Sequence, residues 1–162
     1  MNDVKSILVE EMQAYFGSDT NRINHALAVT GYAEKLLGPE NGDYPIVIAA
    51  AVLHDIGIHE AEKKYGSASG RYQEIEGPPI ARGILTKIGF ESSQINEICE
   101  IIAHHHSPGT VTTVNFKILY DADWLVNIAG HYNIEDSAKL KSIIDRVLLT
   151  KSGKTLAGQI YL

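Results

Sequence analysis

The apolar run from Ile46 to Leu53 ends on a His-Asp pair, in the segment "AAVLHDIGIHE". Pro45 before the run and Gly57 after it are typical of the first and last turns of a helix, so we predict a helix that stops at Gly57. Because this helix is apolar on nearly every side, we expect it at the centre of the fold. An ionised carboxylate in such a place needs a cation, a network of donors or contact with solvent. The position of Asp55 therefore constrains both the fold and the function.

The remaining segments show the spacing of amphipathic helices, and no segment alternates polar and apolar residues as a half-buried strand does. The expected fold class is all-α, a compact single-domain helical bundle. The polar, glycine-rich stretch 59–77 predicts a long loop, and loops of that length often cover binding sites. Further helices are predicted in residues 3–16, in about 21–37, and in the segments "PPIARGILTKIGF", "ESSQINEICEIIAHHH", "NFKILYDADWLVNIAG" and "EDSAKLKSIIDRVLL", with a final turn in the tail.

The composition excludes several classes of protein. The chain has 162 residues, of which 44% are hydrophobic and 21% charged, as expected for one globular domain. A net charge of −6 argues against a broad nucleic-acid surface. No apolar stretch is long enough to cross a membrane, and the acidic, polar N-terminus does not resemble a secretory signal, so we expect a cytoplasmic protein. The single cysteine, Cys99, excludes a disulfide or a cysteine zinc site within one chain, and a homodimer is compatible with the sequence.

Several polar side chains fall on positions that the helical pattern would bury. His25 lies on an apolar helix face, and His54 and Asp55 lie in the last turn of the central helix. The segment "ILYDADWL" adds a carboxylate, but Asp121 and Asp123 point about 200° apart and the pattern does not choose between them. Two imidazoles and two carboxylates from three helices suit a divalent ion such as Mn, Fe, Co, Ni or Zn. The negative end of the central helix dipole would favour the same cation.

Each of these residues also has a purely structural interpretation. A lone His on an apolar face is usually a core histidine that donates to a carbonyl, and a salt bridge with an arginine would explain Asp55 alone. Asp121 and Asp123 could be ordinary acids on a helix surface, and the "HHH" of residues 104–106 could be a solvated helix end. The combination, rather than any one member, favours a metal site.

The combination resembles the HD-domain superfamily of metal-dependent phosphohydrolases. The matching residues are His25 in "NRINHALAVTGYAEKL", His54 and Asp55 in "AAVLHDIG", and Asp123 in "ILYDADWL". The family pattern selects Asp123 over Asp121, because the ligand is the Asp followed by a residue and Leu. The resemblance implies a helical bundle with the metal at its centre. It also implies a single domain over 1–162, with the motif-bearing core at about 20–130 and C-terminal helices at 135–162.

The resemblance further implies a chemistry and a role for particular residues. The reaction would be hydrolysis of a small phosphate ester or a nucleotide by water activated on one divalent ion (Mn, Fe, Co, Ni, Zn or Mg). The implied metal ligands are His25, His54, Asp55 and Asp123. His105 in "IIAHHHSP" would protonate the leaving oxygen or bind the phosphoryl group, with His104 and His106 as less favoured alternatives, and Asp55 would also take part in catalysis. The residues assigned to the substrate are Arg22, Lys64, Arg71 and Glu76.

Two features depart from the family pattern. Ile58 lies one turn after the His-Asp pair, at the position where nucleotidase-like members often carry a carboxylate, so the general base is left open. The candidates for that base are Glu60, Glu76 and Asp121. The helix near "EIEGPP" lacks the extra His of two-metal members, which favours one ion, although Glu76 or the histidines at 104 and 105 could recruit a second. The alternative functions are a two-iron oxygenase of the HD type and a non-catalytic sensor that binds a metal or a nucleotide.

Overall fold

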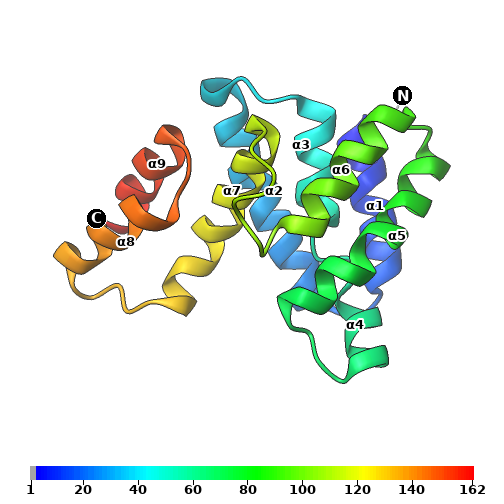
Figure 1. Cartoon of the computed structure of the whole chain (residues 1–162), viewed down its shortest axis with the longest axis horizontal. Coiled ribbons are helices and arrows are strands. Elements are labelled where there is room, and N and C mark those ends of the chain that lie inside the picture. Colours follow the sequence, from blue (N-terminus) through cyan, green and yellow to red (C-terminus); the bar gives the residue numbers. More distant parts are fainter. Residues whose placement is uncertain (1–2) are drawn as a thin grey trace.

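The structure, a computed structural model, describes residues 3–162, and this part of the chain folds into nine α-helices with no strand (Figure 1). The all-α fold class is therefore confirmed. No helix in this range combines the length and the apolar character that crossing a membrane requires. The helices are α1 (Val4–Phe16), α2 (Thr20–Glu40), α3 (Tyr44–Leu53), α4 (Ile58–Tyr65), α5 (Gly70–Ile88), α6 (Ser92–His104), α7 (Val114–His131), α8 (Ser137–Val147) and α9 (Lys151–Tyr161).

Helix α3 lies at the centre, as its apolar sequence predicts. Every residue from Ile46 to Leu53 is buried, and α3 contacts α1, α2, α6 and α7. The predicted stop at Gly57 is wrong, because the helix ends at Leu53 and the chain then forms a tight turn. The amide of Ile56 bonds to the carbonyl of Leu53 at 3.0 Å, which is the spacing of a turn rather than of an α-helix. His54 and Asp55 therefore lie in a turn just beyond the end of α3, and this turn is inside the bundle.

The long loop predicted for 59–77 is also wrong, because most of this stretch belongs to α4 and α5. Ile58 and Ala61 give α4 a narrow buried face, and Gly66 ends the helix in the left-handed conformation with φ 66°. The buried face of α5 begins with polar or small residues, so the apolar periodicity that marks a helix is missing there. Pro78 and Pro79 lie inside α5 rather than at its start.

Two glycines allow α5 to approach the turn that follows α3. A Cβ added to Gly57 would lie 2.5 Å from the backbone nitrogen of Gly77. A Cβ on Gly77 would lie 2.9 Å from the side chain of Ile102 on α6. The turn and α5 therefore meet at backbone distance, with Ile102 of α6 packed against the same glycine, which places the side chains of α5 near the end of the central helix.

Helices α8 and α9 form the C-terminal part of the molecule, beside α7 and α2 (Figure 1). The tail forms the whole of α9 rather than the single turn predicted. Asp121 on α7 is fully buried and fixes the start of α9. Its carboxylate accepts bonds from the amides of Leu149 and Thr150, both at 2.8 Å, and from the Thr150 hydroxyl at 2.6 Å. The side chain of Thr150 in turn caps α9.

Replacing the buried Asp121 with alanine should destabilise the protein strongly. Asp121→Ala leaves two amides and a hydroxyl without their acceptor, so we expect the free energy of unfolding to fall by about 2–4 kcal/mol. Urea denaturation followed by circular dichroism measures this loss. Asp136→Ala, which removes the exposed cap of α8, is the matched control and should cost about 0.5–2 kcal/mol. Equal losses in the two variants would contradict the anchoring role of Asp121.

Candidate metal centre

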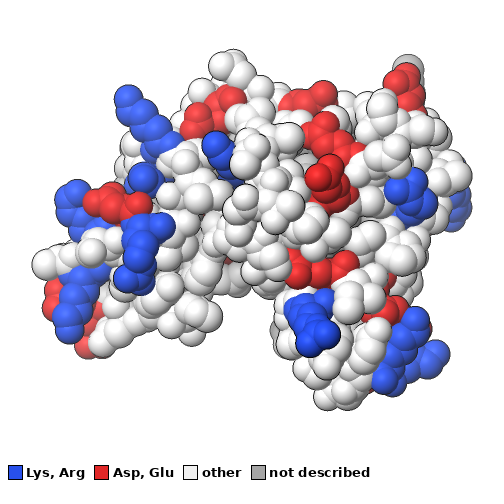
Figure 2. Space-filling view, viewed as in Figure 1, with Lys and Arg blue, Asp and Glu red and all other residues white. Residues whose placement is uncertain are grey.

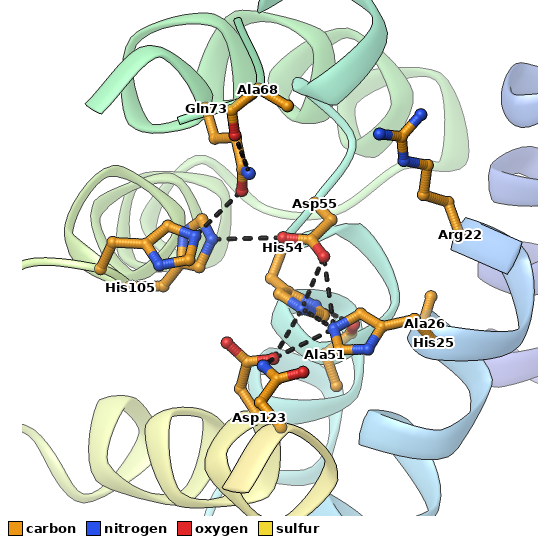
Figure 3. Close-up of polar contacts among 12 residues, drawn as sticks. Arg22, His25, Ala26, Ala51, His54, Asp55, Ala68, Gln73, His105 and Asp123 are labelled. Carbon is orange, nitrogen blue, oxygen red and sulfur yellow. Dashed lines mark hydrogen bonds and ion pairs between the residues drawn. The ribbon is translucent and has the colours of Figure 1, made fainter. Parts of the chain in front are cut away.

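Four side chains from three parts of the chain converge at the end of α3 (Figure 3). His25 comes from α2, His54 and Asp55 come from the turn after α3, and Asp123 comes from α7. His54 has no exposed surface, and Asp55 and Asp123 are 9% and 8% exposed. The structure thus brings together the four residues that the sequence analysis singled out as ligands.

The distances among these four groups fit one divalent ion. His25 Nε2 lies 3.1 Å from Asp123 Oδ1, 3.3 Å from Asp55 Oδ2 and 3.3 Å from His54 Nε2. His54 Nε2 lies 3.4 Å from each of the same two carboxylate oxygens. Two ligand atoms that are each about 2.1 Å from a metal lie about 3.0 Å apart at an octahedral angle and about 3.4 Å apart at a tetrahedral angle. The donor set of nitrogen and oxygen suits a transition metal such as Mn, Fe or Zn.

Contacts outside the cluster orient two of its members. His54 Nδ1 lies 2.7 Å from the carbonyl oxygen of Ala51. A carbonyl oxygen can only accept a hydrogen bond, so Nδ1 carries a proton. When the ring is neutral, Nε2 therefore faces the cluster with its lone pair. The Asn127 amide donates to Asp123 Oδ1 at 2.9 Å, the same oxygen that faces the histidines. Asn127 was not predicted from the sequence, although its position one helical turn after Asp123 indicates that the two side chains share a helix face.

Electrostatics keep both carboxylates ionised. Burial lowers the pKa of His54, but the charges of Asp55 and Asp123 outweigh this effect and hold that pKa well above 6.5. Burial raises the pKa of Asp55, but His54 and His105 outweigh it and hold it well below 3.8. The pKa of Asp123 is lowered in the same way by His54 and His25. Two buried negative charges therefore face one point, which is the arrangement that a divalent cation would neutralise.

His105 adds a fifth group with an unsatisfied atom. The residue is 2% exposed, and its Nδ1 donates to the carbonyl of Ile102 at 2.6 Å. Its Nε2 is buried and has no hydrogen-bond partner within residues 3–162, although it lies 3.4 Å from Asp55 Oδ1. Buried polar atoms without partners are rare in folded proteins, and a catalytic role or a bound water or ion is among the explanations. The four converging residues therefore fit a bound metal ion, and His105 fits a further ligand beside that ion.

The two neighbours of His105 have different environments. His104 is partly exposed, and its side chain makes no hydrogen bond or ion pair with the cluster in the described chain. His106 Nε2 lies 3.0 Å from Gln73 Oε1, and the Gln73 amide nitrogen donates to the carbonyl of Ala68, so His106 Nε2 must carry a proton. Burial lowers the pKa of His106.

Asp55, His105 and His106 have ligand atoms within 4.8 Å of one another, which makes them a second group that could hold an ion.

The basic residues assigned to the substrate lie outside the cluster, and two of them already have acidic partners. Arg22 pairs with Asp19 at 3.0 Å and with Glu62 at 2.8 Å. Lys64 pairs with Glu76 at 2.7 Å. Arg71 is exposed and makes no ion pair within residues 3–162. Of the three, Arg71 is therefore the one whose charge is not already balanced.

The three candidates for the general base also lie apart from the four converging groups. Asp121 points to the start of α9, as described above, so the structure does not support it as a base. Hydrogen bonds from Lys64 and Tyr65 lower the pKa of Glu76, which weakens it as a proton acceptor. Glu60 is 4.0 Å from the Lys64 amine. None of the three contacts the metal cluster within the described chain.

A cavity of about 450 Å³ opens beside the cluster, between α7 and the end of α6. Asp123, His105 and His106 form its inner wall. The residues that form the rest of the wall were not predicted from the sequence as site residues. These include Tyr120, Trp124, Asn127 and His131.

Fold and site together define an all-α protein with a buried His/Asp cluster able to hold a divalent metal ion. The family model described as "HD domain" matches residues 22–128, which contain all four converging residues and His105. A crystal structure described as a predicted HD superfamily hydrolase, from an uncultured Thermotogales bacterium, is similar with a TM-score of 0.71 and 27% identity. The match covers 95% of this chain and 83% of that one. No curated protein matches the chain.

The chain therefore belongs to the HD domain family. HD domains generally bind divalent metal ions, and the cluster at the end of α3 could hold one.

Removing either carboxylate should abolish metal binding. We expect about one ion per wild-type chain and far less in Asp55→Ala and Asp123→Ala, because each loses a charged oxygen ligand. Elemental analysis of the purified proteins measures the content. Asp43→Ala is the control, since Asp43 is exposed and its side chain caps nothing. Full metal content in both cluster variants would contradict the assignment of these ligands.

Metal binding should also release protons and weaken as the pH falls. The raised pKa of His54 means that its Nε2 holds a second ring proton more tightly than a free imidazole does when no metal is bound. An ion must displace that proton, so its apparent affinity should fall as the pH is lowered from 8 to 6. Calorimetric titration in two buffers with different ionisation enthalpies measures the protons released. A binding enthalpy that does not depend on the buffer would contradict this expectation.

Proposed function

We propose that the chain is a metal-dependent phosphohydrolase that cleaves a phosphate ester or anhydride bond in a small molecule. Membership of the HD family and the likeness to a protein described as a predicted hydrolase support this function. The observation that carries it is His105, a buried residue that lines the cavity and whose Nε2 lies 3.4 Å from Asp55 Oδ1 without a hydrogen-bond partner within residues 3–162. Ile102 fixes the ring at Nδ1 and Asp55 lies beside Nε2, so the Nε2 of this histidine can exchange a proton with a bound substrate.

Each residue of the site has a role in this proposal. His25, His54, Asp55 and Asp123 would hold the ion, which would polarise a phosphoryl oxygen and lower the pKa of a water molecule when bound. His105, protonated at Nε2, donates to the leaving oxygen, while the carbonyl of Ile102 fixes the orientation of its ring. Asp55 holds His105 and the metal cluster together, because its two oxygens face one each.

The substrate in this proposal is small and phosphorylated, with nucleotides as the class that the family resemblance implies. The cavity beside Asp123 would contain its organic part. Arg71, the basic candidate without an ion pair, would contribute positive charge near the start of α5.

Substituting His105 should separate catalysis from metal binding. The metal-loaded protein should release phosphate from at least one member of a panel of phosphomonoesters, nucleoside di- and triphosphates and cyclic nucleotides. His105→Ala should retain its metal and lose about 10²–10⁴-fold in kcat, because it removes the general acid. His104→Ala should change kcat by less than about threefold, since its ring does not contact the cluster.

Three results would contradict the proposed hydrolase. Absence of turnover across the panel, with tight ligand binding that is unchanged in His105→Ala, would favour a non-catalytic sensor. Iron near two atoms per chain would favour a two-iron oxygenase that uses the second group of ligands. Equal activity of His105→Ala and the wild type would leave His105 without the assigned role.

A further inference from the structure

The cavity beside the metal cluster has an aromatic wall on one face of α7. Tyr120, Trp124 and His131 lie at helical spacing and line the cavity together. The rings of Trp124 and His131 are 5.1 Å apart and nearly perpendicular, at 88°. The ring of Tyr132 packs against one side of this corner of two rings, 5.8 Å from Trp124 and 5.1 Å from His131. Tyr132 does not line the cavity, so a ligand ring would stack on the side of the corner that faces the cavity. Tyr120 is held in place by Phe116, on which it stacks at 5.8 Å.

The charges of the cavity select against polyphosphates. Its lining contains no Lys or Arg, and its one acidic residue, Asp123, belongs to the metal cluster. Figure 2 shows the same pattern, since the surface over the C-terminal half of α7 is free of charged side chains, whereas charged side chains lie over α8 and α9, near α4, and over α3 and α6. A triphosphate chain would bring several negative charges that Lys or Arg normally compensate. A single phosphoryl group at the cluster needs no such compensation in the cavity.

The volume of the cavity and the side-chain amide of Asn127 in its wall agree with a ligand that carries a single phosphoryl group. A volume of about 450 Å³ is near the lower end of the range of about 300–1,000 Å³ for small-molecule sites. It suits one ring system with a sugar rather than a dinucleotide. The Asn127 amide nitrogen is used by Asp123, and its oxygen has no partner within residues 3–162, so it can accept a bond from a ligand hydroxyl or amine.

We infer that the corner of Trp124 and His131 binds the planar ring of the substrate, and that the substrate class is a nucleoside monophosphate. This inference rests on the proposed function for the fate of the phosphate. The phosphoryl group lies at the metal cluster next to His105, the sugar lies beside Asn127, and the base lies against the aromatic corner. Trp124 and His131 therefore determine specificity without touching the reacting atoms.

Fluorescence tests the ring site without any turnover, because Trp124 is the single tryptophan of the chain. Adenosine, which lacks the phosphate, should quench the Trp124 emission of the full-length protein saturably, and ribose 5-phosphate should not. In calorimetry on the Mn-loaded protein, adenosine monophosphate should bind about tenfold more tightly than ribose 5-phosphate, as expected for one stacked base. Adenosine triphosphate should bind no more tightly than the monophosphate.

Substitutions of Trp124 and His131 test whether the base of the ligand binds against these two side chains. His131→Ala, a change at an exposed residue, should weaken binding of adenosine monophosphate about fivefold or more and leave ribose 5-phosphate unaffected. Trp124→Ala should have the same effect, and Trp124→Phe should restore most of the affinity. Tyr44→Ala, at an exposed tyrosine at the start of α3, is the control and should bind as the wild type does.

The results separate this inference from the proposed hydrolase. Equal affinity for adenosine monophosphate and ribose 5-phosphate, or no quenching by adenosine, would overturn the ring site even if the protein hydrolyses other phosphate esters. Tighter binding of the triphosphate by tenfold or more would overturn the assignment to monophosphates. Saturable quenching that is lost in His131→Ala would support the ring site even if no member of the panel is hydrolysed.

Discussion

The attraction between the carboxylates of Asp55 and Asp123 and the imidazole of His54 is the interaction on which the rest of the site depends. Every residue of α3 from Ile46 to Leu53 is buried and apolar, so the polar groups of this segment enter the bundle only where the helix ends. There the two carboxylates stay ionised; a proton on His54 compensates one of the two negative charges, and a divalent cation would compensate both. Helices α2 and α7 must pack against each other in one register for His25 and Asp123 to reach that point.

The sequence was sufficient to predict buried polar groups at these positions, because the burial of a residue can be inferred from the apolar pattern of its immediate neighbours. His25 lies on an apolar face, and the His-Asp pair follows an apolar run, so each position predicts a buried polar group without knowledge of the tertiary structure. The choice between Asp121 and Asp123 could not be made in this way. Both are buried, at 0% and 8% exposure, and one faces α9 while the other faces the cluster. Only the family motif separated them.

The features that the sequence did not reveal depend on contacts between distant segments. Residues 59–77 look like a loop because the inner face of α5 carries Gln73 and Glu76, whose partners lie on other elements. The close approach of Gly57 to Gly77 supplies the packing that apolar side chains would otherwise signal. The cavity wall was missed for a similar reason, since aromatic residues at helical spacing on α7 are equally consistent with an ordinary core.

Helix α7 links stability, metal binding and the cavity through its different faces. Asp121 and Asp123 project about 200° apart, so α9 holds one side of the helix while the metal cluster holds the other. A rotation of α7 that moved the cavity wall would therefore break both sets of contacts. The wall can change more easily through its own side chains, because Trp124 and His131 take part in neither set. In this architecture the chemistry is fixed by the position of the helix, and the choice of ligand depends on residues that can vary around it.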